Sequence, residues 1–175
     1  MVGGAGISFG ARWLAPRERK VVELAEARAR VEGVKAAGGR VALTNGCFDL
    51  LHPGHVRFLQ AVRRQADFLV VGVNADASVR ALKGPGRPVL PEGDRAFMVA
   101  ALEAVDCVVL FPELTAVALV RALRPHLYAK GGAYASLSFP ERSAAEECGA
   151  RLLFVPQDAY STTSLLRRLA GERQQ

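Results

Sequence analysis

Hydrophobic and polar positions alternate in blocks along this chain, and the blocks predict strands and helices in turn. Short runs that are apolar at nearly every position predict buried strands, because a strand covered on both faces has no polar side to show. Five such runs occur: RVALT (40–44), FLVVGVN (68–74), CVVLF (107–111), LYAK (127–130) and RLLFV (151–155).

Segments with helical spacing of apolar residues lie before, between and after these strands. They predict helices over 17–37, 52–65, 76–82, 94–104, 115–123, 141–148 and 161–169. Strands that alternate with amphipathic helices are typical of right-handed βαβ units. The fold class is therefore α/β, a Rossmann-like, doubly wound, parallel sheet of five strands.

The chain of 175 residues has the length of one domain and contains no internal repeat. We divide it into an N-terminal extension and helix, residues 1–37, and a main domain, residues 38–175. The N-terminal helix is a candidate contact for a homodimer, and a monomer is equally compatible with the pattern.

Composition narrows the class of protein. No apolar run reaches the roughly 18 residues of a membrane span, and the first residues lack the order of a signal peptide. We therefore expect a cytoplasmic protein with no membrane partner. Three widely spaced cysteines, an odd number, argue against a disulfide framework and against a closed zinc site.

The net charge of +6 and the pI near 9.7 permit an anionic partner. The basic residues are scattered singly or in short pairs, and they are not interleaved with aromatic residues. A small anionic substrate therefore explains this charge as well as a polymer would. We predict no nucleic-acid partner.

The segment TNGCFDLLHPGH (44–55) follows the first strand and holds two of the three histidines. In parallel sheets ligands bind at the carboxyl ends of the strands. Pro53 suits the first turn of a helix, so His52, Gly54 and His55 surround a helix N-terminus, whose N–H groups and dipole favour an anion. The pattern predicts a phosphate site. Two capping histidines are one alternative, and a zinc site with Cys47, which lacks a fourth ligand, is another.

Two further segments carry polar groups that can reach the carboxyl ends of the strands. LKGPGRP (82–88) places Lys83 and Arg87 in a loop rich in glycine and proline, which suits the binding of anionic oxygens; an exposed loop with ordinary charges is the alternative. YSTTSLL (160–166) sets three hydroxyls at a helix start, where Ser161 or Thr162 can cap the helix. Arg95 begins another helix, where it can pair with a nearby carboxylate such as Glu92.

GCFDLLHPGH resembles the G-x-F-D-x-x-H-x-G-H signature of the cytidylyltransferase-like nucleotidyltransferases. Class I aminoacyl-tRNA synthetases share HPGH but need a much longer chain and a lysine-rich second motif. Within the superfamily the chain most resembles the adenylyltransferase half of the bifunctional heptose kinase/adenylyltransferases of lipopolysaccharide precursor synthesis. No kinase half accompanies it here, so the resemblance implies a stand-alone nucleotidyltransferase domain over residues 38–175. The matching segments are TNGCFDLLHPGHVRFL, VVGVNADASVRALKGPGRPV, DRAFMVAALEAVDCVVLF, LRPHLYAKGG and YSTTSLL.

The resemblance implies roles for individual residues. His52, His55 and Lys83 are the expected catalytic residues, and Lys83, Arg87 and Arg95 are expected on the substrate phosphates. Asp49 either holds Mg²⁺ through water, orients a histidine, or satisfies backbone N–H groups. The chain departs from its relatives at Ala133, where they carry aspartate. The nucleotide-binding residues are expected to be Asn45, Gly46, Cys47, Phe48, Gly54, Lys130, Gly131, Ser161, Thr162 and Thr163.

The reaction that the resemblance implies is transfer of AMP from ATP, with Mg²⁺, to D-glycero-β-D-manno-heptose 1-phosphate, giving ADP-heptose and pyrophosphate. A cytidylyltransferase acting on glycerol 3-phosphate or a similar alcohol phosphate is the alternative. Those enzymes carry R-T-E-G-I-S-T-T, whereas this chain has PQDAYSTT, with Pro156 at the place of the arginine. A nucleotide-binding module without catalysis is a third hypothesis, and Ala133 is its only support.

Overall fold

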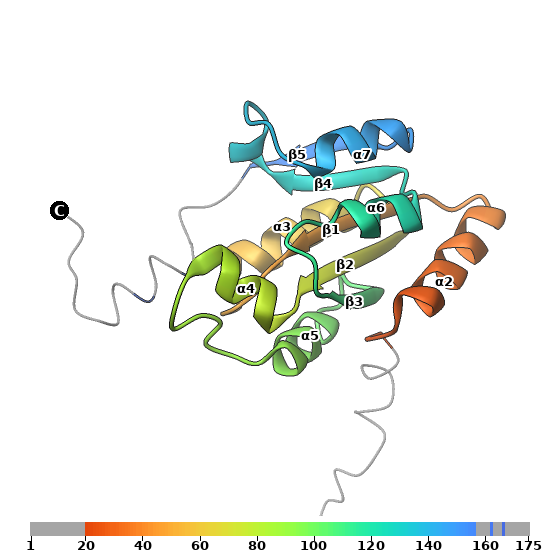
Figure 1. The fold of residues 1–175 in the computed structure, drawn as a ribbon. Coiled ribbons are helices and arrows are strands. Elements are labelled where there is room, and N and C mark those ends of the chain that lie inside the picture. Colours follow the sequence, from red (N-terminus) through yellow and green to blue (C-terminus); the bar gives the residue numbers. More distant parts are fainter. Residues whose placement is uncertain (1–19, 157–161, 163–165, 167–175) are drawn as a thin grey trace, which may run out of the picture.

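A parallel sheet forms the centre of the molecule in the computed structural model, which describes residues 20–156 together with Thr162 and Leu166. The strand order is β3-β2-β1-β4-β5, and every pairing is parallel. This confirms the predicted α/β class with a Rossmann-like sheet of five strands (Figure 1). The strands are β1 (Val41–Gly46), β2 (Phe68–Asn74), β3 (Cys107–Phe111), β4 (Leu127–Gly131) and β5 (Arg151–Val155).

Helices cover both faces of this sheet. The described helices are α2 (Leu24–Ala36), α3 (Pro53–Arg63), α4 (Asp76–Lys83), α5 (Glu92–Ala100), α6 (Val117–Leu123) and α7 (Glu141–Glu147), with a short 3-10 turn, η1 (Gly132–Tyr134). Buried residues of α2, α6 and α7 share one core with the sheet, and those of α3 and α5 share the other. No helix among the described residues is long and apolar enough to cross a membrane.

The two cores explain why the strands are apolar at nearly every position. Along β2, Leu69, Val71 and Val73 face the core with α3 and α5, while Val70 faces the core with α2 and α6. All four side chains are fully buried. Because successive side chains of a strand point to opposite faces, a sheet covered on both sides needs apolar residues at every position.

The predicted N-terminal helix begins later than expected. The pattern predicts a helix from Arg17, whereas α2 starts at Leu24, and residues 17–19 lie outside the described part of the chain. Val21 forms a parallel bridge with Val108, and the Val22 N–H donates to the Val108 carbonyl at 3.0 Å. The edge of β3 offers unpaired backbone groups, and pairing with them holds Val21 and Val22 outside the helix that their pattern predicts.

The order of the strands creates a switch point between β1 and β4. From β1 the chain passes through α3 on one face of the sheet, and from β4 it passes through α7 on the other. The loops after Gly46 and Gly131 therefore diverge from neighbouring strands. Ligands of doubly wound sheets bind at this position, outside the carboxyl ends of the strands.

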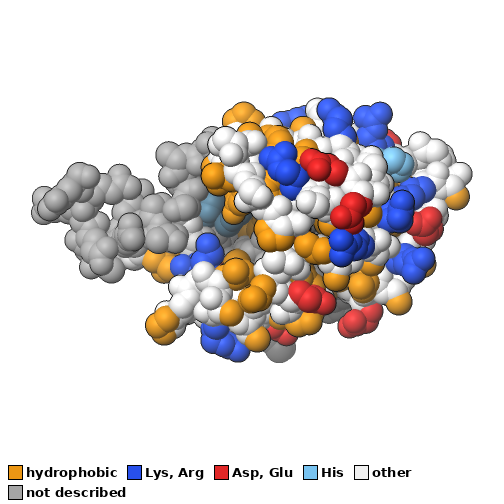
Figure 2. Space-filling model, turned by 45° about the horizontal axis from the view of Figure 1, so that its top comes forward, with side chains coloured by type: hydrophobic (Ala, Val, Ile, Leu, Met, Phe, Trp, Pro, Cys, Tyr) orange, Lys and Arg blue, Asp and Glu red, His pale blue; other side chains and the backbone are white. Residues whose placement is uncertain are grey.

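Charged side chains do not gather on the face that Figure 2 shows. Lys and Arg side chains lie singly among Asp and Glu side chains over that face, with hydrophobic atoms between them. This agrees with the scattered basic residues of the sequence.

Candidate active site

The carboxyl end of β1 shapes the loop that carries both histidines. Phe48 takes a left-handed backbone conformation, with φ at +47°, and its side chain is buried. A Cβ atom on Gly46 would lie 3.2 Å from the Phe48 ring, so glycine leaves the room that the ring occupies. The buried ring fixes the course of the chain between β1 and α3.

His52 and His55 stack on one another at the N-terminus of α3. Their ring centroids lie 3.8 Å apart at an interplanar angle of 20°, and the Phe48 ring lies 5.2 Å from that of His55. His52 is the N-cap residue, because its Nδ1 accepts from the His55 backbone N–H at 3.4 Å. The proton of a neutral His52 ring is therefore on Nε2, which makes that atom a donor. The capping role and a phosphate role use different nitrogens of this ring and are compatible.

Burial keeps both imidazoles neutral at pH 7. Desolvation and, less strongly, the neighbouring His52 lower the pKa of His55 to about 4, while the backbone carbonyl of Leu50 acts in the opposite direction. Desolvation also lowers the pKa of His52. Nδ1 of His55 is buried and meets no hydrogen-bond partner among the described residues. A buried polar atom without a partner is rare in folded proteins and is often found at functional sites.

The lowered pKa of His55 makes stability depend on pH. The unfolded chain binds a proton at His55 near pH 6.5 and the folded chain near pH 4, so the unfolded state holds more protons between these values. We expect the free energy of unfolding to fall as the pH is lowered from 6.5 to 4, by up to roughly 3 kcal/mol from this group. Urea denaturation across that range measures the slope. His55→Gln should flatten it, and an unchanged slope in that variant would show that other groups cause it.

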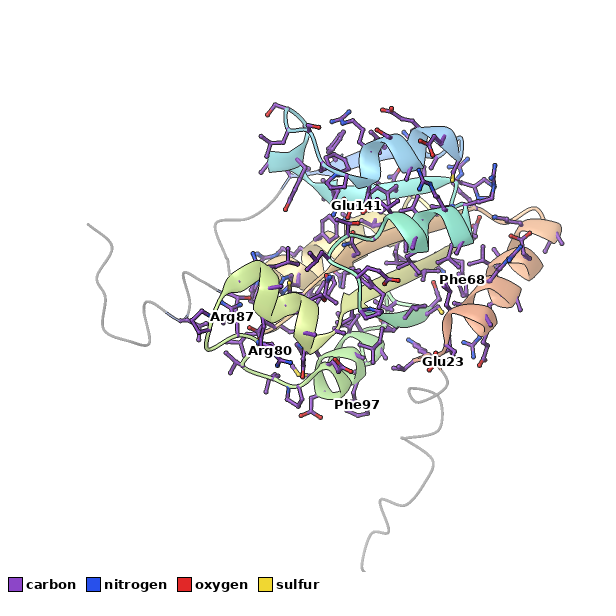
Figure 3. The ribbon with its side chains drawn as sticks, in the orientation of Figure 1. Glu23, Phe68, Arg80, Arg87, Phe97 and Glu141 are labelled. Atoms are coloured by element: carbon purple, nitrogen blue, oxygen red, sulfur yellow. The ribbon has the colours of Figure 1, made fainter. Side chains whose placement is uncertain are left out.

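The loop after α4 is attached to the histidine loop through Asp49. This carboxylate is buried, forms an ion pair with Arg87, and accepts from the backbone N–H groups of Val89 and Leu90 at 2.7 and 3.2 Å. Arg87, labelled in Figure 3, lies on that loop. Both oxygens of Asp49 are thus engaged within the chain, an arrangement that does not favour the magnesium role, which stays a prediction. Of the alternatives, the structure favours the satisfaction of backbone N–H groups. The described residues contain no cluster of His, Cys, Asp and Glu suited to a metal ion.

Arg95 connects the same two loops and has no surface exposed to solvent. Its side chain is fully buried, and it donates to the Cys47 carbonyl at 2.5 Å, the Leu90 carbonyl at 3.0 Å and the Asp76 carboxylate at 2.7 Å. Each guanidinium nitrogen thus has a protein partner, and the phosphate contact of Arg95 stays a prediction. The alternative of an ion pair holds, with Asp76 in place of Glu92.

Lys83 differs from the two arginines. It ends α4, its side chain is exposed, and its charge reaches the histidine loop. Burial raises the pKa of the Cys47 thiol, while the positive charges of Lys83, Arg95 and Arg87 act in the opposite direction. Of the three cations predicted on substrate phosphates, Lys83 is the one whose side chain the structure leaves exposed to solvent.

The end of β4 meets the end of β1 through Lys130. Its ammonium donates to Oδ1 of Asn45 at 2.9 Å and pairs with Glu141 at 3.7 Å. Glu141 carries no motif that marks it in the sequence, since an acidic residue is ordinary in the first turn of a helix. Gly131 is buried beside these groups, and Ala133 is exposed in η1.

One hydroxyl of the YSTTSLL segment falls within the described residues. Thr162 is helical, and its Oγ1 donates to the Leu50 carbonyl at 3.3 Å, which brings this residue next to the histidine loop. Ser161 and Thr163 lie outside the described residues. The phosphate contact of this segment stays a prediction.

The chain shares its sequence pattern with a known protein family. A family model described as cytidylyltransferase-like matches residues 43–167, which include both histidines, Lys83, Lys130 and Thr162. The chain belongs to the cytidylyltransferase-like family. It is a nucleotidyltransferase, and the resemblance seen in its motifs is confirmed.

Curated relatives named bifunctional protein HldE are similar over most of this chain. The protein from Pelobacter propionicus is 48% identical over 140 residues, covering 79% of this chain and 29% of the relative. That from Bradyrhizobium diazoefficiens is 45% identical over 160 residues, covering 91% and 32%. That from Geobacter sulfurreducens is 41% identical over 170 residues, covering 97% and 34%. The chain therefore spans about a third of the length of these relatives.

A solved structure is similar in fold and in sequence. The crystal structure of the lipopolysaccharide core biosynthesis protein from Thermoplasma volcanium superimposes with a TM-score of 0.57 at 26% identity. The match covers 71% of this chain and the whole of that one.

Proposed function

We propose that this chain transfers AMP from ATP to D-glycero-β-D-manno-heptose 1-phosphate, forming ADP-heptose and releasing pyrophosphate. The observation that carries the proposal is the stacked pair of neutral imidazoles at the N-terminus of α3, with the Lys83 charge close by. The choice of nucleotide and sugar is supported by identities of 41–48% to the HldE relatives and by the motifs shared with heptose adenylyltransferases.

The nucleotidyl transfer requires hydrogen-bond donors and positive charge more than it requires a general base. An oxygen of the sugar phosphate attacks the α-phosphorus of the triphosphate, a new P–O bond forms, and the bond to the β-phosphate breaks to release pyrophosphate. The second pKa of a phosphate monoester is about 6, so the attacking group is already ionised at pH 7. The protein's contribution is to position two anions in line and to stabilise the charge that develops on the transferred phosphate.

Three groups have the properties that these tasks require. Nε2–H of His52 and the His55 ring would donate to the α-phosphate and to the oxygen that leaves with pyrophosphate. Lys83 would offset the repulsion between the sugar phosphate and the triphosphate. The segment 161–163 would hold the outer phosphates, and the contact of Thr162 with Leu50 supports its place near them.

Magnesium would enter with the triphosphate as part of the substrate. Asp49 does not fit as its ligand, because Arg87 and two backbone N–H groups occupy the carboxylate. A Mg²⁺ ion bound to phosphate oxygens and water needs no carboxylate of the protein to enter the site.

The proposed function is tested by pyrophosphate release. The chain is mixed with Mg²⁺, heptose 1-phosphate and either ATP or CTP, with a control that omits the sugar phosphate. We expect release with ATP that depends on the sugar phosphate, and little or none with CTP. Release with CTP alone would overturn the proposal and favour a cytidylyltransferase, whose acceptor would then be sought among alcohol phosphates such as glycerol 3-phosphate. If the chain binds ATP but releases no pyrophosphate with either triphosphate, the result would contradict the proposed sugar phosphate.

A further inference from the structure

Lys130 is enclosed by protein groups on several sides. Its ammonium lies 5.5 Å from the ring centre of Tyr128, 5.3 Å from that of Tyr134 and 5.8 Å from that of Phe139. Together with Asn45 and Glu141, these rings leave the side chain only 13% exposed. An ammonium in this cage has little surface left for a phosphate.

The charge of Lys130 is also matched within the protein. Glu141, labelled in Figure 3, reaches from the start of α7 to the turn before α6, where Oε1 accepts from the Ala116 N–H at 2.9 Å. Its other oxygen pairs with Lys130, and both side chains are largely buried. Burial lowers the pKa of Lys130, and Glu141 opposes that shift. A buried ion pair of this kind presents almost no net charge to a triphosphate.

The contacts of Lys130 fix the orientation of the Asn45 amide. Oδ1 of Asn45 accepts from Lys130 at 2.9 Å and from the Tyr128 hydroxyl at 2.5 Å. Burial raises the pKa of Tyr128, so the phenol stays protonated and can donate. An ammonium has only donors to offer, so it must meet the amide oxygen, and the tyrosine proton meets the same atom. The amide N–H₂ group is consequently turned away from β4.

We propose that Lys130 is a positioning residue for Asn45, and that the Asn45 amide N–H₂ donates to the nucleoside triphosphate bound at the carboxyl end of β1. This rests on the proposed function, which puts a nucleotide at the switch point. It assigns Lys130 a different task from the direct nucleotide contact that the motif implies. The pair Lys130–Glu141 then joins the ends of β1 and β4 to the starts of α6 and α7 and holds one substrate-facing amide.

The test is a double-mutant cycle on nucleotide binding. Dissociation constants are measured by calorimetry, without acceptor, for whichever of Mg–ATP and Mg–CTP the wild-type chain binds more tightly. Asn45→Ala and Lys130→Met are each expected to weaken binding about tenfold, the loss typical of one hydrogen bond near charged groups. In the Asn45→Ala background, Lys130→Met should have almost no further effect, because the group that it positions is gone.

Equal losses from Lys130→Met in both backgrounds would mean that the ammonium itself touches the nucleotide, and would overturn the inference. An Asn45→Ala variant with wild-type affinity would do the same. Lys130→Met leaves Glu141 unpaired and is therefore also made together with Glu141→Gln, which removes the stranded charge. Tyr128→Phe gives an uncharged check, with a loss of about threefold that vanishes in the Asn45→Ala background.

The result of the double-mutant cycle does not depend on the proposed reaction. It uses binding of the triphosphate alone, so a wrong sugar phosphate or a preference for CTP would defeat the proposed function while leaving the coupling between Asn45 and Lys130 measurable.

Discussion

His55→Ala is expected to lower kcat by roughly a hundredfold or more. The variant removes one donor to charge that develops in the transition state, and losing such a donor typically costs about 2.7–4 kcal/mol. Burial lowers the pKa of His55 to about 4, so the neutral ring is a weak base at pH 7, and the loss should come from a missing hydrogen bond more than from a missing proton acceptor. Pyrophosphate release at saturating substrates measures the effect.

Two further variants make the result specific. His55→Gln keeps an N–H donor and should lose less than the alanine variant. His126, the third histidine, lies just before β4, at the amino-terminal end of the strands, where its Nδ1 accepts from the Val41 N–H at 3.0 Å. His126→Ala should keep a normal kcat in the folded fraction. A near-normal rate for His55→Ala would remove this ring from the proposed mechanism.

Arg95→Met is expected to lower the free energy of unfolding by about 3 kcal/mol, the low end of the range for breaking a buried pair by removing one partner. The low end applies because the Asp76 side chain is 25% exposed, so water can partly solvate it once the guanidinium is gone. The variant also leaves the carbonyls of Cys47 and Leu90 without their donor. Urea denaturation measures the change, with the slope on denaturant compared between variants.

Arg121→Met is the matched control. Arg121 pairs with Glu147 at 2.9 Å, but each side chain is 56% exposed, and ion pairs in such positions contribute at most about 1 kcal/mol. The two variants remove the same group from opposite environments. An Arg95→Met chain with wild-type stability and lost activity would contradict the structural role and return Arg95 to the substrate phosphates.

The structural role of Arg95 has a consequence for the site. Its guanidinium joins the histidine loop at Cys47 to the loop at Leu90, and Asp49 makes a second connection to that same loop. Lys83 stands at the beginning of this loop. Because the two loops are held together inside the protein, the distance between the histidines and Lys83 is set before any substrate arrives, which reduces the cost of ordering the site.

Local features of the sequence determined the strands and the place of the histidines. A strand covered on both faces must be apolar at every position, so β1 to β5 stand out as continuous apolar runs. Pro53 and the two flanking histidines mark a helix start wherever the segment lies, since proline fits the first turn and an N-cap precedes it. These patterns depend only on residues that are close in the sequence, so they can be interpreted without the tertiary structure.

Only the tertiary structure decided what each charged side chain touches. Arg95 meets Cys47 and Lys130 meets Asn45 across 48 and 85 residues of sequence, because the strand order sets β1 between β2 and β4. A cation near a phosphate site and a cation buried against a carbonyl look alike in the sequence. Likewise, Val21 forms a bridge with Val108 at the edge of β3 and does not join the helix that its sequence pattern predicts. In each case the outcome depended on which partner the fold brought within about 3 Å, the distance over which a hydrogen bond acts.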